Sequence, residues 1–246
     1  MADPTLNVLD GSTFVVGDRR GDLCSDTERE HGFFSEDTRF LSQWSLRVDG
    51  KSLDLLGMDQ ESHFAVALFL TPRVGPEDQA PCSVMRRRCI DRVWIEEITI
   101  VNHRPAASDV CVELDVDTDF ADLFEVKDGA VAHRHVTWHE DGASLVLEYE
   151  RGAFRRSVTI TSDQPAEISR RGFTFRSRSS VAGNGRRRYA SPLARLNTGR
   201  RSPAAPCTGA WTTSSERRRW SSSSGLRVPR RWTPRTRKSR APIPPA

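Results

Sequence analysis

Two stretches near the start of the chain carry charged side chains that could hold a polar ligand. They contain Asp18, Arg19, Arg20, Asp22, Glu36, Asp37 and Arg39. Carboxylates present fixed acceptors and guanidinium groups present fixed donors, so loops that carry both can bind sugar hydroxyl groups. The same groups can instead form ion pairs that brace two long loops. We therefore keep two alternatives for this set: a substrate-binding or domain-docking surface, and an internal brace in which Asp37 pairs with Arg39.

A second group of carboxylates could supply the acid and base of a glycosidase. This group consists of Asp117, Asp119, Asp122 and Glu125. Hydrolysis of a glycosidic bond needs two carboxylates about 5 to 10 Å apart. The alternative is a structural turn that buries Phe120, Leu123 and Phe124 in the core and leaves the acids outside. A small stand-alone glycosidase is thus one function to weigh.

Two further clusters have ordinary structural explanations. His133, His135 and His139 would share one face of a strand, as zinc ligands could, but no cysteine lies nearby in the sequence. Arg86, Arg87 and Arg88 could contact phosphate, but a solvated strand end is the commoner origin of such a run. We expect no metal and no cofactor.

The charge of the chain divides it into two different parts. Residues 1–175 hold 19 Lys and Arg against 32 Asp and Glu, whereas residues 176–246 hold 18 against 1. Arg, Ser and Pro supply 37 of the last 71 positions, and Val, Ile, Leu and Met only six. Such a composition buries too little apolar surface to offset the entropy of ordering. We therefore expect residues 1–175 to fold by themselves and residues 176–246 to be a disordered tail.

Two origins are open for the tail. Its arginine clusters are interleaved with Trp211, Trp220 and Trp232. That pattern is typical of an arm that binds nucleic acid non-specifically, through phosphate charge and base stacking. Its abrupt start and its Arg, Ser, Pro and Trp content also fit GC-rich DNA read in the wrong frame. We favour a frameshifted or truncated gene product, with a nucleic-acid-binding protein as the alternative.

The remaining composition predicts a cytoplasmic protein. No apolar run approaches the roughly 20 residues of a membrane span, and the first residues lack the pattern of a signal peptide. The five cysteines form no CxxC pair, so we expect reduced thiols rather than a disulfide framework.

The elements that must position these groups are predicted to be strands. Apolar residues alternate with polar ones in Trp44, Leu46 and Val48 and in Val110, Val112, Leu114 and Val116, as in strands with one buried face. The predicted strands fall at 5–16, 40–48, 52–58, 63–70, 84–101, 110–116, 130–138, 144–150, 154–161 and 168–175. Residues 18–36 are predicted to be a polar loop. Helical signals are almost absent, so periodicity predicts an all-β, antiparallel β-sandwich.

Four stretches, in this order, give the chain a resemblance to a known family. They are Asp10–Val16, Asp18–Asp22, Gly32–Phe34 with Asp37–Ser42, and Asp119–Val126. Together they resemble the N-terminal β-domain of bacterial glycogen-debranching, amylo-alpha-1,6-glucosidase-like proteins. The resemblance covers roughly the first half of the chain and ends near Phe175.

The resemblance implies a β-sandwich of the supersandwich type and a place among glycoside hydrolases. The catalytic carboxylates of that family lie in a helical barrel that follows the β-domain, and no such helical segment is encoded here. We therefore expect residues 1–175 to be the non-catalytic N-terminal domain of a carbohydrate-active protein, without catalytic residues or enzymatic activity of its own. The implied partners are an alpha-glucan or a helical glucosidase domain, which full-length relatives carry on the same chain.

Overall fold

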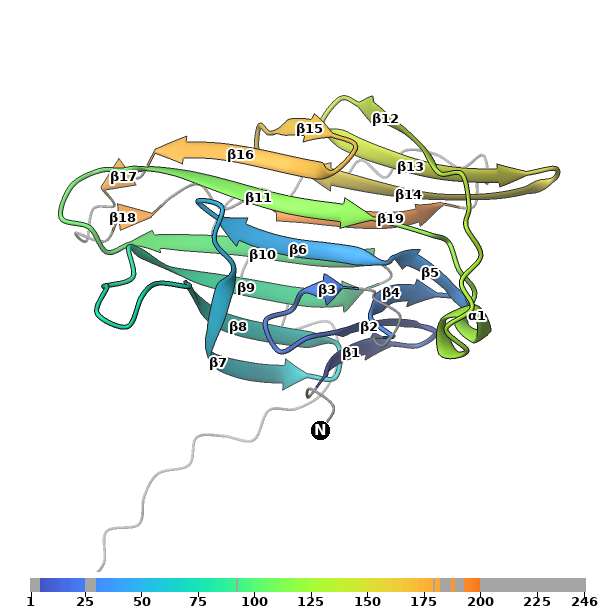
Figure 1. Ribbon diagram of the computed structural model, residues 1–246, viewed down its shortest axis with the longest axis horizontal. Helices are drawn as coiled ribbons and strands as arrows, with labels where there is room; N and C mark the ends of the chain where they lie inside the picture. Colours follow the sequence, from blue (N-terminus) through green and yellow to red (C-terminus); the bar gives the residue numbers. More distant parts are fainter. Residues whose placement is uncertain are drawn as a thin grey trace, which may run out of the picture. The chain divides into compact units, whose positions relative to one another are not determined.

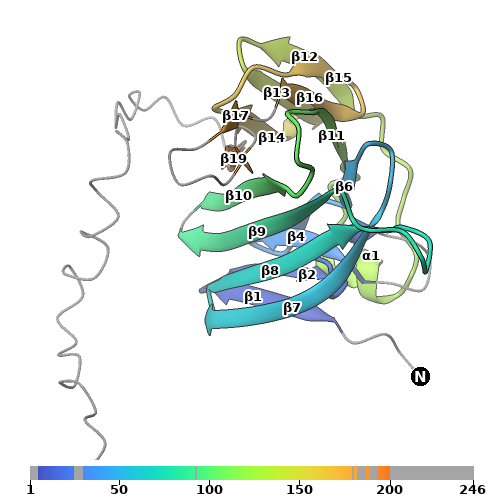
Figure 2. The same cartoon turned by 90° about the vertical axis from the view of Figure 1, so that its left-hand side faces the viewer.

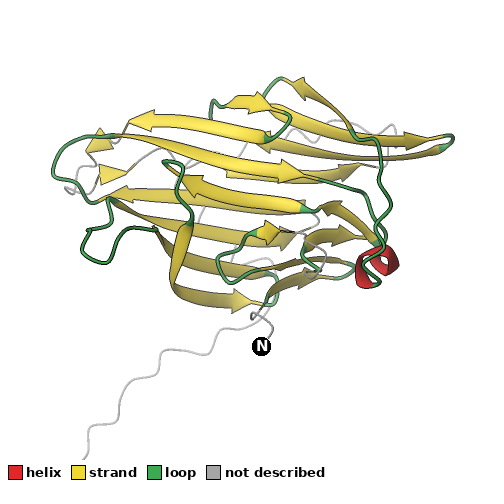
Figure 3. Cartoon of the chain, in the orientation of Figure 1, coloured by secondary structure: helices red, strands yellow, loops and turns green. Residues whose placement is uncertain are grey.

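The computed structural model describes residues 5–24, 30–91, 93–178, 180–181, 187–188 and 193–199. In this part of the chain strands dominate, every paired strand is antiparallel, and the one helix is short (Figure 3). The predicted all-β, antiparallel class is confirmed. That helix, α1 (Leu123–Lys127), has five residues, and no described helix has the length and apolar character that a bilayer span requires.

The first sheet holds four strands from the N-terminal part of the chain (Figure 1). In spatial order they are β1 (Leu6–Asp10), β2 (Thr13–Gly17), β4 (Gly32–Ser35) and β5 (Thr38–Leu41). The predicted hairpin at Asp10–Gly11 is confirmed as β1 and β2. Residues 32–35 are a strand, so the predicted loop is shorter than expected. Glu36 and Asp37, with φ of 45° and 62°, form the two-residue turn to β5, since both central residues of a type I′ hairpin need positive φ.

The second sheet holds five strands that come from distant parts of the sequence. In spatial order they are β15 (Glu167–Ser169), β16 (Gly172–Arg178), β11 (Asp109–Asp117), β6 (Gln43–Val48) and β3 (Leu23–Cys24). The alternation predicted for β6 and β11 is confirmed, because Trp44, Leu46 and Leu114 all lie on the buried face. Gly172 has φ of +127°, and a Cβ there would lie 2.0 Å from the carbonyl oxygen of Leu114, so β16 needs glycine at this position.

The third sheet is the largest and contains the C-terminal strands. Its main path runs through β12 (Thr137–Asp141), β13 (Ser144–Arg151), β14 (Phe154–Ser162), β19 (Leu193–Gly199), β10 (Val93–Asn102), β9 (Cys82–Asp91), β8 (Ala65–Pro72) and β7 (Leu53–Ser62). The short strands β17 (Ser180–Val181) and β18 (Arg187–Arg188) pair beside β10.

Three details of the strand prediction are wrong in this sheet. The apolar stretch 84–101 is a hairpin of β9 and β10, with Trp94 opposite Ile90, and not one strand. The following strand, β11, belongs to the five-stranded sheet and does not pair with β10. The strand expected at 130–138 begins only at Thr137.

The three sheets meet around one tryptophan of β10. The ring of Trp94 lies 5.1 Å from the ring of Trp44 on β6 and 5.2 Å from the ring of Phe33 on β4, measured between centroids. Both tryptophans are fully buried. The five-stranded and four-stranded sheets therefore bury their apolar faces against the ten-stranded sheet, and Figure 2 shows the layers from the side.

The strands continue beyond the predicted domain boundary at residue 175. β16 runs to Arg178, and β19 lies between β14 and β10, where the backbone of Leu196 pairs with both Ile160 and Trp94. The folding of residues 1–175 as a separate domain stays a prediction. The composition averaged over residues 176–246 did not indicate β19, although this strand contains two of the six aliphatic residues of the tail. Residues 200–246 lie outside the described residues. The predicted disorder of the tail, and its predicted origin as a frameshifted product or a nucleic-acid-binding arm, fall on these residues.

The position of β19 predicts how much of the chain is needed for folding. A chain cut after residue 202 should melt cooperatively. A chain cut after residue 175 should melt at a temperature lower by on the order of 10 °C, because β14 and β10 lose the strand between them and the sheet loses several kcal/mol. Circular dichroism melts of the two chains measure this difference. Equal melting temperatures would show that β19 does not contribute to the sheet.

Candidate functional site

The structure separates the seven charged residues singled out from the sequence into two groups. Arg19, Glu36 and Asp37 are exposed. The other four form ion pairs within the protein, and they are Asp18, Arg20, Asp22 and Arg39. The seven residues therefore do not form one charged surface, and the paired four direct their donors and acceptors mainly toward the protein itself.

Asp18 fixes the loop between β2 and β3. Its Oδ1 accepts the backbone N–H groups of Arg20, at 2.8 Å, and Asp22, at 2.9 Å, while its Oδ2 accepts Arg20 Nε at 2.8 Å. Such an Asx-type turn holds the loop in a single conformation. As a result the carbonyl groups of Arg20 and Gly21 point inward, where they accept hydrogen bonds from Arg86 and Arg88.

Below this loop lies a buried network of two arginines and two carboxylates, which we call the buried charge network (Arg86, Arg88, Glu96 and Asp22). Arg86 Nε donates to Glu96 Oε1 at 2.7 Å, and Arg88 Nε donates to Glu96 Oε2 at 2.9 Å. Arg86 Nη1 donates to Asp22 Oδ1 at 2.6 Å. Arg86 and Glu96 are 0% exposed and Arg88 is 2% exposed. The network is closed by Trp44, whose Nε1 donates to Glu96 Oε2 at 3.1 Å.

The two carboxylates of the network respond differently to burial. Burial alone would raise the pKa of Glu96, but Arg86 and Arg88 outweigh it and hold that pKa below its ordinary value of 4.5. Burial raises the pKa of Asp22 above 3.8, against the attraction of Arg86. Ionised Glu96 therefore stabilises the fold above about pH 4.5 and loses this contribution as the pH falls through its lowered pKa. Asp22 has the opposite pH dependence. Its contribution to stability is present below about pH 3.8 and is lost as the pH rises through its raised pKa.

The solvated strand end predicted for residues 86–88 is wrong for two of its three arginines. Arg86 and Arg88 point into the core, and only Arg87 alternates to the outer face of β9. Gly21 makes room for them. A Cβ at this position would lie 2.6 Å from Leu68 Cδ1 and 3.3 Å from Arg88 Nη2, and its φ of +80° also favours glycine.

A second ion pair joins the β4–β5 hairpin to the turn after β11. Arg39 donates from Nε to Asp119 Oδ1 at 3.1 Å and from Nη2 to Asp119 Oδ2, while its Nη1 donates to the carbonyl of His31 at 3.2 Å. The backbone N–H of Arg39 also donates to the carbonyl of Ala121. The predicted pairing of Arg39 with Asp37 is therefore wrong, because its carboxylate partner lies 80 residues further along the chain.

The four acids between residues 117 and 125 have local structural partners. Asp117 accepts Arg170 Nη2 at 2.8 Å, and Glu125 accepts Arg134 Nη2 at 2.6 Å. Asp122 caps α1, and with Glu125 it forms a capping box. Asp122 is exposed, whereas Asp117, Asp119 and Glu125 are half-buried, so the expectation that these acids lie outside is only partly correct.

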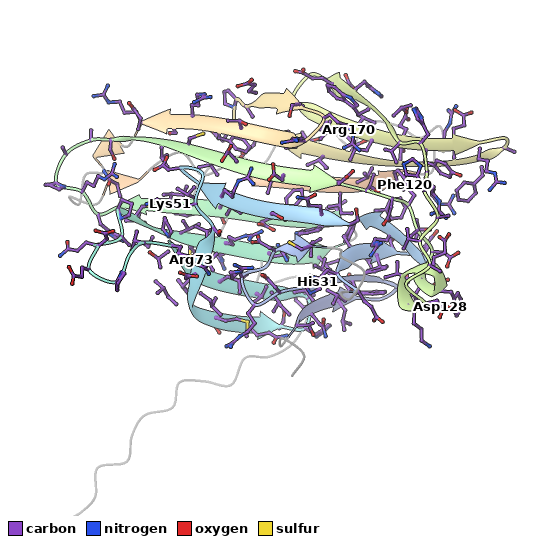
Figure 4. All side chains as sticks on the ribbon, in the orientation of Figure 1. His31, Lys51, Arg73, Phe120, Asp128 and Arg170 are labelled. Atoms are coloured by element: carbon purple, nitrogen blue, oxygen red, sulfur yellow. The ribbon has the colours of Figure 1, made fainter. Side chains whose placement is uncertain are left out.

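The apolar residues of this turn only partly follow the prediction. Phe120, labelled in Figure 4, is buried and packs its ring at 5.8 Å from Phe40 and 6.4 Å from Tyr149. Leu123 packs against a small cluster around Phe34. Phe124 was expected in the core, but it is 71% exposed. The turn is therefore anchored by Phe120 and leaves one large aromatic ring at the surface.

The three histidines do not share a strand face. His133 and His135 precede β12, and His139 lies within it, so the strand alternation that would align them does not apply. In the described part of the chain, no group of three or more His, Cys, Asp or Glu side chains is arranged to hold a metal ion.

Comparison with known proteins places most of the chain in one family. Residues 8–179, which are 172 of the 246 residues, match the family model described as the N-terminal domain of (some) glycogen debranching enzymes. A search of curated proteins gave no significant match.

The Arg39–Asp119 contact predicts a specific pattern of stability. Arg39 is nearly buried, so removing Asp119 leaves an uncompensated charge, and Arg39→Ala or Asp119→Ala should each cost about 2 to 3 kcal/mol of unfolding free energy. The double variant should cost little more than either single variant, because the two share one interaction. Urea unfolding of the three proteins measures this coupling.

Asp37→Asn is the control for this cycle, since Asp37 is exposed, lies two residues from Arg39 and has a positive φ that asparagine tolerates as aspartate does. It should change stability by less than about 0.5 kcal/mol and show no coupling to Arg39→Ala. Additive costs for the Arg39 and Asp119 variants would contradict the pairing.

Proposed function

Since this chain belongs to the family of N-terminal domains of glycogen debranching enzymes, we propose that it is the non-catalytic β-domain of a debranching-type, carbohydrate-active protein that acts on alpha-glucan. Its β-fold is then a sandwich of the supersandwich type. The catalytic carboxylates belong to a helical glucosidase domain, with which this domain associates, and the protein works in the cytoplasm.

The observation that carries a non-catalytic role is the engagement of the acids at residues 117–125. Each of these carboxylates is hydrogen-bonded to a guanidinium group or to backbone N–H groups. A glycosidase needs two carboxylates facing each other across a cleft that admits a sugar ring. Asp122 instead caps a helix N-terminus, and Asp117, Asp119 and Glu125 pair with Arg170, Arg39 and Arg134, which disfavours the stand-alone glycosidase.

The charged loops near the N-terminus support a scaffold rather than a sugar-binding surface. Asp22 reaches the buried charge network, and Arg39 reaches Asp119, so both loops are tied down from inside. Rigid loops on a β-scaffold are suited to positioning a neighbouring domain. Arg19, Glu36 and Asp37 are exposed and can contribute to such a contact at the surface.

This proposal predicts two results with the purified 246-residue chain. The chain should release no glucose from maltoheptaose or glycogen in a coupled glucose assay. It should also bind the remainder of a debranching enzyme that has been expressed without an N-terminal domain of this family, as measured by isothermal titration calorimetry.

Asp119→Asn provides the internal check on the first result, because it alters the acid that is most central to the 117–125 turn. Glucose release by the chain, abolished in this variant, would make the turn an active site. Absence of binding to the remainder of the debranching enzyme would refute the domain assignment.

A further inference from the structure

Two buried N–H donors in the described part of the chain have no acceptor in the protein. They are Nη1 of Arg88, on β9, and Nε1 of Trp94, on β10. Arg88 is 2% exposed and Trp94 is 0% exposed, so bulk solvent does not reach either group. A buried donor without an acceptor lowers the stability of a fold, and a charged donor lowers it more. Each such group in a native structure therefore needs an explanation.

The two donors lie at the same place in the core. The guanidinium carbon of Arg88 is 4.5 Å from the centroid of the Trp94 ring, so the two side chains are in contact. The other nitrogens of this guanidinium group are engaged, because Nε and Nη2 donate to Glu96 Oε2 and Nη2 also donates to the carbonyl of Gly21 at 2.6 Å. Nη1 is thus the one part of Arg88 that the buried charge network does not satisfy.

The equivalent groups next to these donors are satisfied by the protein. Every side-chain nitrogen of Arg86 donates to a carboxylate or a carbonyl group, and Trp44 Nε1 donates to Glu96 Oε2 at 3.1 Å. Glu96 Oε2 accepts three N–H groups, two from Arg88 and one from Trp44, and this exceeds the two lone pairs of a carboxylate oxygen. It therefore has no capacity for the two remaining donors.

From these contacts, we propose that Arg88 Nη1 and Trp94 Nε1 hold one internal water molecule, whose oxygen accepts both N–H groups. Buried waters typically make two to four hydrogen bonds to polar groups that lack other partners, and these two donors meet that requirement. A neutral ligand is favoured over an anion because the two arginines of the buried charge network are balanced by its two carboxylates. This hydration site is independent of the proposed function.

The water belongs to the junction of the three sheets. Trp94 is the residue whose ring contacts both Trp44 of the five-stranded sheet and Phe33 of the four-stranded sheet. A water bound to Trp94 and Arg88 completes the hydrogen bonding of this junction, and it exchanges slowly because both of its donors are enclosed.

Oxygen-17 magnetic relaxation dispersion of the full chain tests the site, because it counts water molecules that stay bound for longer than the protein takes to tumble. Trp94→Phe removes one of the two donors. Trp44→Phe is the matched control, since Trp44 is also fully buried but its N–H donates to Glu96. Both substitutions remove the same atoms from the core, so water that enters the new space affects both variants alike. Circular dichroism melts verify that the two variants are folded.

We expect Trp94→Phe to lower the number of long-lived waters by one relative to the unaltered chain, and Trp44→Phe to leave that number unchanged. Equal changes in the two variants would overturn the proposal. If either variant does not fold, a crystal structure of the unaltered chain decides, and it should show a density peak about 2.7 to 3.2 Å from both nitrogens. Absence of this peak would also overturn the proposal.

Two other acceptors would overturn the proposal as well. One is an anion, which a melting temperature that rises with sodium chloride, but not with sodium gluconate at the same ionic strength, would reveal if Trp94→Phe abolishes the rise. The other is a protein group from outside the described residues, seen bonded to either nitrogen in the same crystal structure.

Discussion

Four charges enclosed in an apolar core must stay paired, and the rest of this fold is arranged to keep them so. Arg86 and Arg88 of β9 hold Glu96 of β10 between them, and Asp22 reaches them from the loop after β2. An unpaired charge at this depth would cost several kcal/mol. The pairing therefore fixes the register of β9 against β10 and the path of a loop more than 60 residues away in sequence.

The same network connects the sheets that the apolar contacts bring together. Trp44 of the five-stranded sheet donates to Glu96 of the ten-stranded sheet, and Asp22 accepts the backbone N–H of Leu46 on the same strand as Trp44. The Arg39–Asp119 pair does the same for the β4–β5 hairpin and the turn before α1. In the sequence, Asp22 and Arg39 resemble residues that bind a polar ligand. In the structure they belong to the buried charge network and to the Arg39–Asp119 pair.

The sequence predicted the class of fold but not the placement of these charges. Alternation identified β6 and β11 because their inward residues are all apolar. In β9 the same alternation puts Arg86 and Arg88 in phase with Val84 and Ile90, and in β10 it puts Glu96 in phase with Trp94. The signal for the network was thus present, as two arginines and one glutamate on inward positions of adjacent strands. The interpretation of 84–101 as one strand missed this signal, because it did not recognise that β9 and β10 pair as a hairpin.

Long-range pairing was beyond local patterns. Arg39 and Asp119 are separated by 80 residues, and proximity in sequence favoured the wrong partner, Asp37.

Substitution of Glu96 tests most directly whether the fold depends on the buried charge network. Glu97 is the control, because it is the neighbour whose side chain alternates to the outer face. We expect Glu96→Gln to lower the free energy of unfolding at pH 7 by about 3 to 5 kcal/mol, and Glu97→Gln by less than about 1 kcal/mol. Equal small losses in both variants would contradict a fold that depends on the buried charge network.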